Sequence, residues 1–154
     1  MRGFTAIEMM IVVVIIAILT AIAAPNMGQM IRNQRVKTAA FDIFASLTYA
    51  RSEAVKRNQA VTIAANNAAD WTRGWTIRDA NNAILKQETD RNLNPDERPF
   101  TGPASVTFAR TGRLSDAVAP QFVLTAPTVP VERHRCIRVD LSGRPITKEG
   151  AAPC

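Results

Sequence analysis

The residue of this 154-residue chain that is hardest to explain by packing alone is Glu8. It lies near the start of an apolar run over residues 4–24, in which the only other polar side chains are Thr5 and Thr20. A carboxylate inside a membrane segment costs about 2.5–3.5 kcal/mol, so such a group usually marks a function and has a partner. The run contains no cation, so the partner of Glu8 is expected outside it.

A second group of charged side chains lies near the C-terminus and consists of Arg133, Arg135, Arg138, Arg144 and Lys148. Arginine binds phosphate through paired N–H donors and keeps its charge, so this segment is a candidate for binding double-stranded DNA. Because no aromatic side chain is interleaved, such binding would be sensitive to salt and independent of base sequence. The alternative is a tight turn that carries solvated charges.

No catalytic residue and no metal or cofactor site is predicted. The sequence has no glycine-rich phosphate loop, and no nucleophile stands at a known spacing from a histidine and an acid. His134 is the sole histidine and lies between two arginines, so it is expected at the surface. Cys136 and Cys154 are the only cysteines and have no histidine at ligand spacing, so a metal site is not expected there.

The apolar run is just long enough for a transmembrane helix, which needs about 20 apolar residues. A secretory signal peptide would explain the small residues at 21–23, but the run is longer than a usual signal-peptide core and Glu8 interrupts it. A single-pass anchor would explain the length of the run but not Glu8. A third interpretation uses Gly3, Phe4 and Glu8 together.

The string Gly3-Phe4-Thr5-Ala6-Ile7-Glu8, followed by an apolar helix, resembles the N-terminus of type IV pilins and pseudopilins. The resemblance implies that a prepilin peptidase cleaves after Gly3 and methylates Phe4. It also implies that Glu8 meets the terminal amine of a neighbouring subunit, since a buried carboxylate and a buried amine are tolerable when paired. The predicted leader, residues 1–3, carries a single basic side chain, and an upstream start codon is an open alternative.

Length and charge limit the number of domains and the kinds of partner that the remainder of the chain can have. One small soluble domain is predicted over residues 31–154, after a hydrophobic transmembrane or filament-core helix over residues 4–30. The chain carries 19 basic and 13 acidic residues, which gives a net charge of +6. A basic balance favours anionic partners, although solubility alone would also explain it.

The resemblance further implies a location for each part of the chain. The helix would lie in the inner membrane with the soluble domain in the periplasm, and the assembled protein would belong to a cell-surface pilus. In a periplasmic domain Cys136 and Cys154 are expected to form a disulfide, which would stabilise the domain by about 3 kcal/mol. Two free thiols are the alternative.

The long helix is predicted to continue into the soluble domain. Pro25 and Gly28 weaken a helix, but the pattern is again helical over residues 31–57, so a bend is predicted there. One face is apolar at spacings of three and four residues, which is the period of a helix. It comprises Val36, Ala40, Ile43, Leu47, Ala50 and Ala54. A continuous helix over residues 4–57 would be about 80 Å long.

The sides of this helical face are also predicted. Phe44 and Val55 are expected to widen the apolar face. The opposite, polar side carries Gln34, Asp42, Ser52 and Lys56, with Arg35 and Glu53 on its flank. Phe41 falls on the polar side as well, where it either contacts a neighbouring subunit or is a single exposed aromatic.

After Asn58 the hydrophobic period changes from 3.6 to 2, which is typical of short β-strands over the region 59–154. Strands are predicted over residues 61–64, 75–78, 84–87, 106–109, 122–124, 136–141 and 145–148, with loops at 66–70 and 92–103 and turns at 79–82, 111–113 and 142–143. Ile137, Val139 and Leu141 are predicted to point inward, and Trp71 and Trp75 to pack in the core. The predicted fold class is α+β and pilin-like, with the long helix packed on a small antiparallel β-sheet domain.

Three segments narrow the resemblance to one group of pilins. Residues 47–55 and the pair Trp71 and Trp75 resemble GspH/FimT/FimU-type minor pilins. Gly143-Arg144-Pro145 resembles the Gly-Arg-x-Arg element of FimT-type pilins, whose basic loop contacts DNA during natural transformation. Ile146 stands where the second arginine would fall.

The function implied by the resemblance is that of a minor pilin of a type IV pilus. Such a protein would act in pilus assembly or priming near the tip, with the prepilin peptidase and other pilins as partners. Two alternatives remain, a DNA-binding pilin for natural transformation and a minor pseudopilin of type II secretion.

Overall fold

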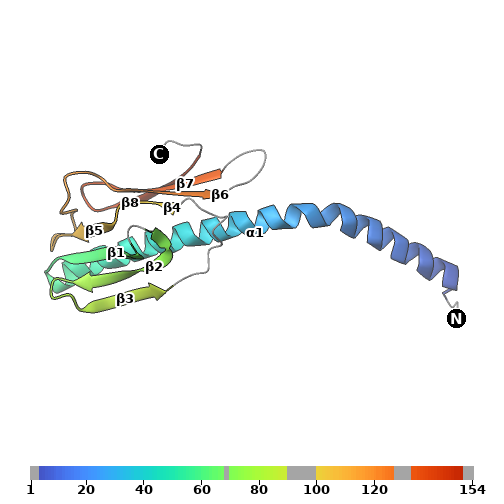
Figure 1. Cartoon of the computed structure of the whole chain (residues 1–154), viewed down its shortest axis with the longest axis horizontal. Coiled ribbons are helices and arrows are strands. Elements are labelled where there is room, and N and C mark those ends of the chain that lie inside the picture. The colour runs from blue at the N-terminus through green and yellow to red at the C-terminus, as the bar shows by residue number, and fades with distance from the viewer. Residues whose placement is uncertain (1–3, 68–69, 90–99, 127–132, 151–154) are drawn as a thin grey trace.

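The computed structural model describes residues 4–67, 70–89, 100–126 and 133–150, in which one helix and eight strands are present. They are α1 (Ala6–Arg57), β1 (Val61–Asn67), β2 (Asp70–Asp79), β3 (Ile84–Thr89), β4 (Phe100–Thr101), β5 (Ser105–Phe108), β6 (Gln121–Ala126), β7 (Arg133–Val139) and β8 (Pro145–Gly150). Figure 1 shows α1 as a long rod whose C-terminal half lies beside the strands, while its N-terminal half extends away from them.

α1 is one continuous helix of 52 residues, which makes it about 78 Å long at 1.5 Å per residue. It begins after Thr5, whose side-chain oxygen accepts a hydrogen bond from the Glu8 N–H at 3.4 Å. It ends at Asn58, which adopts the left-handed conformation and donates its N–H to the carbonyls of Ala54 and Val55. The predicted continuity is confirmed, and Figure 1 shows the ribbon curving along its length.

The predicted α+β fold is confirmed, with the strands divided between two four-stranded antiparallel sheets. The first sheet has the strand order β3-β2-β1-β5, and the second has the order β4-β6-β7-β8. β4 and β5 follow one another in the chain but belong to different sheets, so the chain passes back and forth between them. α1 packs against strands of both sheets. Residue pattern specifies a strand but not its partner, and the division is therefore a tertiary feature.

The core lies between α1 and the two sheets. All six predicted apolar helix residues, Val36, Ala40, Ile43, Leu47, Ala50 and Ala54, are buried, as are Ile137 and Val139 of β7. Trp71 of the first sheet stands edge-on to Phe122 of the second, with ring centroids 4.9 Å apart. The indole N–H of Trp75 donates to Ser46 Oγ on α1 at 3.0 Å, so both tryptophans pack in the core as predicted.

The structure corrects three predictions about individual side chains. Val55 is 54% exposed instead of extending the apolar face, because it lies about 100° around the helix from Ala54, which faces the core. Glu53, predicted on the polar flank, is buried because the last turn packs toward the sheets and supplies two cations to its carboxylate. Leu141, predicted to point inward, is 47% exposed because β7 ends at Val139 and Leu141 lies in the following turn.

Two predicted loops are shorter than expected within the described residues. Residues 66 and 67 continue β1, and residue 70 begins β2. Within the predicted loop 92–103, residues 100 and 101 form β4, because they pair with Leu124 and Val123 of β6. Residues 68–69 and 92–99 of these predictions lie outside the described part of the chain.

Candidate functional site

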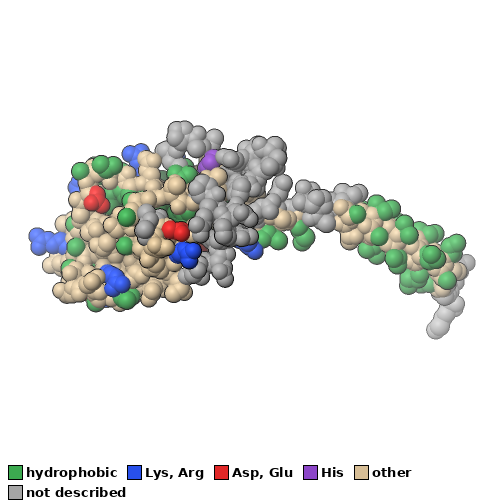
Figure 2. Space-filling view, in the orientation of Figure 1, with side chains coloured by type: hydrophobic (Ala, Val, Ile, Leu, Met, Phe, Trp, Pro, Cys, Tyr) green, Lys and Arg blue, Asp and Glu red, His purple; other side chains and the backbone are tan. Residues whose placement is uncertain are grey.

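The N-terminal half of α1 carries a long run of exposed apolar side chains. Its large apolar side chains between residues 4 and 19 are 44–76% exposed, and Figure 2 shows hydrophobic side chains along the far end of the rod. In the part of the chain that the structure describes, no helix combines the length and the hydropathy needed to cross a membrane. The transmembrane assignment of residues 4–30 stays a prediction.

Glu8 lies in the first turn of α1, where a negative charge suits the positive end of the helix dipole. Its side chain is exposed, and none of the basic side chains in the described residues forms an ion pair with it. Phe4, the predicted mature N-terminus, is 76% exposed just before the helix begins. Gly3 lies outside the described residues, so the cleavage and methylation sites stay predictions.

The predicted basic residues of the second sheet are divided between its two faces. Arg138 of β7 stands opposite Ile146 of β8, and Lys148 stands opposite Cys136. Opposite residues share a face, so Arg138, Ile146 and Lys148 lie together on the outer face, where all three are exposed. Arg135 is instead paired with Glu149, with Nη2 and Oε2 3.0 Å apart. The Arg133 side chain lies outside what the structure describes.

Arg144 lies in the turn that joins β7 to β8. Asp140 holds this turn, because its Oδ1 accepts the Arg144 N–H at 2.9 Å and the Ser142 hydroxyl at 2.5 Å. The Ser142 hydroxyl and then the Arg144 N–H stabilise the ionised carboxylate and lower the pKa of Asp140. The Arg144 side chain remains exposed at the surface.

Arg51 is a residue for which the sequence pattern suggested no role. From α1, its Nε donates to the carbonyl of Gly112 at 3.1 Å and its Nη2 donates to the carbonyl of Ser142 at 3.3 Å. Gly112 follows β5 of the first sheet, whereas Ser142 precedes β8 of the second. A single side chain on the helix therefore contacts turns that belong to both sheets. The two acceptor residues lie 61 and 91 positions beyond Arg51 in the sequence.

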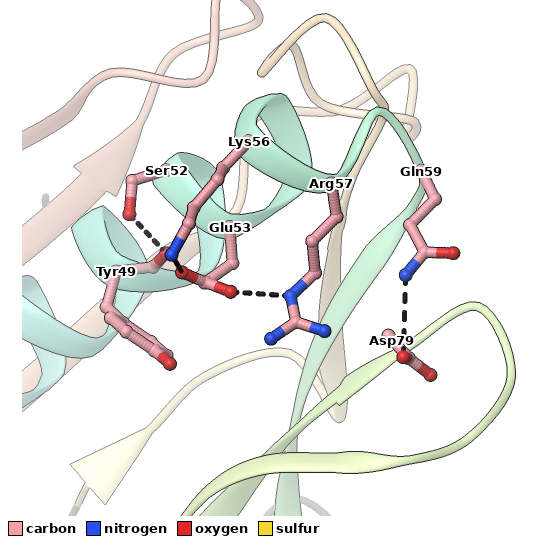
Figure 3. Close-up of polar contacts among 7 residues, drawn as sticks. All are labelled: Tyr49, Ser52, Glu53, Lys56, Arg57, Gln59 and Asp79. Carbon is pink, nitrogen blue, oxygen red and sulfur yellow. Dashed lines mark hydrogen bonds and ion pairs between the residues drawn. The ribbon is translucent and has the colours of Figure 1, made fainter.

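A cluster of charges closes the C-terminal end of α1 (Figure 3). The Glu53 carboxylate binds Arg57 Nε at 2.6 Å and Lys56 Nζ at 3.4 Å. The hydrogen bond from Arg57 is the main cause of the lowered pKa of Glu53. Nearby, the Gln59 side-chain amide donates to Asp79 Oδ2 at 3.4 Å, which links the start of β1 to the β2–β3 turn. The two ion pairs lie within α1 itself, and the Gln59 contact holds the segment that follows the helix to the end of β2.

The remaining candidate residues lie on β7. Cys136 is buried, and its predicted partner Cys154 lies outside the described residues, so the disulfide stays a prediction. His134 Nδ1 is 2.9 Å from the hydroxyl of Thr125 on β6. Among the described residues, no group of three histidine, cysteine or acidic side chains is arranged to hold a metal ion.

An N-terminal helix that packs with its second half on antiparallel sheets is a pilin-like architecture. The family model described as "Type II transport protein GspH" matches residues 39–143. This chain therefore belongs to the GspH family. No curated protein matches it.

Solved structures carry the same fold. One is a crystal structure of the type IV minor pilin FimU of Pseudomonas aeruginosa (strain PAO1) in space group P21. It has a TM-score of 0.63 and 24% sequence identity over 75% of this chain and 90% of that chain. A second FimU structure, in space group P65, has a TM-score of 0.57 and 24% identity over 73% of this chain and 91% of that chain.

Proposed function

We propose that this protein is a minor pilin of a type IV pilus, processed by a prepilin peptidase and acting in pilus assembly or priming near the tip. The observation that carries the proposal is the exposed apolar half of α1. Exposed apolar surface costs roughly 25 cal/mol per Å² relative to burial, so burial of this half by another molecule is favourable. In the inner membrane, with the soluble domain in the periplasm, lipid covers residues 4–30. In the filament, the helices of other pilins do.

Glu8 is the residue on which assembly depends in this proposal. Cleavage after Gly3 gives Phe4 a free amine, which is then methylated, and the amine of one subunit pairs with Glu8 of its neighbour. The pairing offsets the cost of placing a carboxylate among apolar helices. The lack of an ion pair to Glu8 within the described residues supports a partner from another subunit.

The test is the Glu8→Gln variant of the full-length protein, produced in its own cell. Glutamine keeps the shape of the side chain and removes its charge, so incorporation into sheared pili should fall at least about tenfold while the membrane fraction retains the protein. Asp116→Asn removes an exposed carboxylate of the soluble domain and serves as the matched control. Equal incorporation of both variants would contradict the proposal.

A pseudopilin of type II secretion would use the same helix and the same glutamate. The description of the matched family supports this alternative. Deletion of the gene separates the two roles. Loss of surface pili with normal export of secreted proteins supports the pilus role, and the reverse outcome supports secretion.

DNA binding is a second candidate function, favoured by the exposed outer face that carries Arg138 and Lys148 beside the turn with Arg144. Ile146 lies between the two strand cations and contributes no phosphate contact. Salt-sensitive binding to duplexes of unrelated sequence is expected, since phosphates alone would be contacted. Loss of binding in the Arg138→Gln, Lys148→Gln double variant is the test.

A further inference from the structure

The turns at residues 109–113 and 140–144 are built alike, although they come from different sheets. In the first, Ala109 N–H donates to the Arg113 carbonyl at 2.8 Å and Gly112 N–H donates to the Ala109 carbonyl at 2.8 Å. In the second, Asp140 N–H donates to the Arg144 carbonyl at 3.1 Å and Gly143 N–H donates to the Asp140 carbonyl at 2.8 Å.

The sequences of the two turns agree with this shared geometry. The first ends in Thr-Gly-Arg and the second in Ser-Gly-Arg, so Arg113 and Arg144 hold equivalent positions. Gly112 and Gly143 have φ of 75° and 82°, the left-handed conformation that a three-residue hairpin loop requires of its glycine. We call these two segments the twin turns.

The twin turns pack directly against each other. A Cβ added to Gly143 would lie 1.9 Å from the Gly112 carbonyl oxygen and 3.4 Å from Arg113 Cα. Leu114 N–H also donates to the Leu141 carbonyl at 3.4 Å. The close approach of the two backbones therefore depends on glycine at position 143 and brings the two Gly-Arg pairs side by side.

Arg51 fixes the twin turns to the helix as one unit. Its guanidinium donates to a carbonyl of each turn, at 3.1 Å and 3.3 Å. The first turn also rests on the helix at Val55, because a Cβ on Gly112 would lie 2.9 Å from Val55 Cγ2. The side chains that leave the twin turns consequently start from a backbone that is held by the other turn and by Arg51 and Val55 of α1.

Three exposed arginines leave the twin turns: Arg110, Arg113 and Arg144. None of them forms an ion pair with a carboxylate among the described residues. The charge of Arg144 nevertheless contributes to the lowered pKa of Asp140. Three like charges on adjoining turns repel one another, and this repulsion is relieved by a bound polyanion. Arginine pairs with phosphate oxygens through two parallel N–H bonds.

We propose that the twin turns form one phosphate-binding surface that holds the sugar–phosphate backbone of DNA, with Arg113 and Arg144 as equivalent contacts and Arg110 beside them. The proposal rests on the second candidate function and adds the turn from the first sheet to it. The twin turns contact the C-terminal end of α1, opposite its apolar half, so lipid head groups around that half are out of reach. Leu141 is the single exposed apolar side chain of the twin turns, too little for insertion into a membrane.

The test uses the full-length protein in a neutral detergent and labelled duplex DNA of several unrelated sequences at low and moderate salt. The Arg110→Gln, Arg113→Gln double variant should bind at least about tenfold more weakly at low salt. Its plot of log affinity against log salt should be less steep by about two, roughly one per lost phosphate contact. The control double variant, Arg78→Gln with Lys86→Gln, removes the same charge from β2 and β3 and should change affinity less than about twofold.

Arg51→Lys tests the positioning part of the proposal, because it keeps the charge and removes the two-carbonyl contact. Affinity should fall several-fold while the salt slope stays nearly constant, which a mere loss of charge would not produce. Circular dichroism melting of each variant verifies that the domain is folded.

Three outcomes would overturn the proposal, and they differ in whether the second candidate function fails as well. If the unaltered protein does not bind duplex DNA at low salt, the second candidate function fails as well. If it binds but the Arg110→Gln, Arg113→Gln variant matches the control, only the role of the twin turns fails. If vesicles with anionic lipid bind through these arginines and DNA does not, the surface recognises a membrane instead.

Discussion

The two halves of α1 belong to one continuous helix and yet face opposite environments. In the half between residues 4 and 19, the large apolar side chains are 44–76% exposed. In the half beyond residue 36, a single apolar stripe is buried against two sheets, with Ile43, Leu47, Ala50 and Ala54 fully inaccessible. The difference shows that the folded domain buries the apolar side chains of only the C-terminal half of α1.

The two halves of α1 are therefore expected to have different roles, one in stability and the other in assembly. Burial of the second half stabilises the domain, so substitutions there should be measured as changes in the free energy of unfolding. The large apolar side chains between residues 4 and 19 are not buried by the domain, so substitutions there should be measured as changes in assembly. The following predictions sharpen or break this contrast.

The largest effect is expected for Leu47→Ala, which creates a cavity between α1 and the sheets. The free energy of unfolding should fall by about 2–5 kcal/mol. The matched substitution Leu19→Ala lies in the exposed half and should leave the unfolding of the domain unchanged. Chemical denaturation of both proteins in detergent measures the two values, and equal losses would break the contrast.

Ser46→Ala should have the next largest effect, because it removes the acceptor of the Trp75 indole N–H in a buried site. An unsatisfied buried donor costs about 1–3 kcal/mol. Thr48→Ala serves as the control, since the Thr48 hydroxyl is exposed and bonds only the Phe44 carbonyl of its own helix. Denaturation midpoints that differ by less than experimental error would exclude a role for the Ser46 contact.

The pH dependence of stability should reveal the contribution of Glu53 in the buried half of α1. The pKa of Glu53 is lowered, chiefly by the Arg57 hydrogen bond, so ionised Glu53 stabilises the folded state above its unfolded pKa. This stabilisation is lost as pH falls through the lowered folded pKa of Glu53. Glu53→Gln should therefore flatten the acid limb of the stability curve, which chemical denaturation at a series of pH values measures.

The smallest effect is expected for Phe41→Ser, although it removes a whole aromatic ring. Phe41 is 67% exposed on the outer side of α1, so its loss should change the free energy of unfolding by less than about 0.5 kcal/mol. Its predicted contact with a neighbouring subunit is measured separately, as incorporation into pili. A large loss of domain stability would mean that the outer side of α1 is covered within the chain.

The site was predictable from sequence to different degrees. Arg138 points outward because side chains alternate along β7 and Ile137 and Val139 point inward, which is a local property. That Lys148 of β8 lies on the same face follows from the register between the two strands. The pairing of Arg135 with Glu149 depends on the register between β7 and β8, which the pattern did not give. The role of Arg51 depends on contacts with residues 61 and 91 positions away, and no local pattern encodes these.

The sequence by itself determined the features that arise from local periodicity and charge. These are the continuous helix over both halves, the buried stripe that includes Ile43 and Leu47, the positions of most strands and the apolar segment around Glu8. Only the tertiary structure decided which strands share a sheet, that Glu53 is buried beside Arg57, and that the twin turns meet under Arg51. Periodicity fixes the direction in which a side chain points, whereas pairing and packing depend on which distant segments the folded chain brings together.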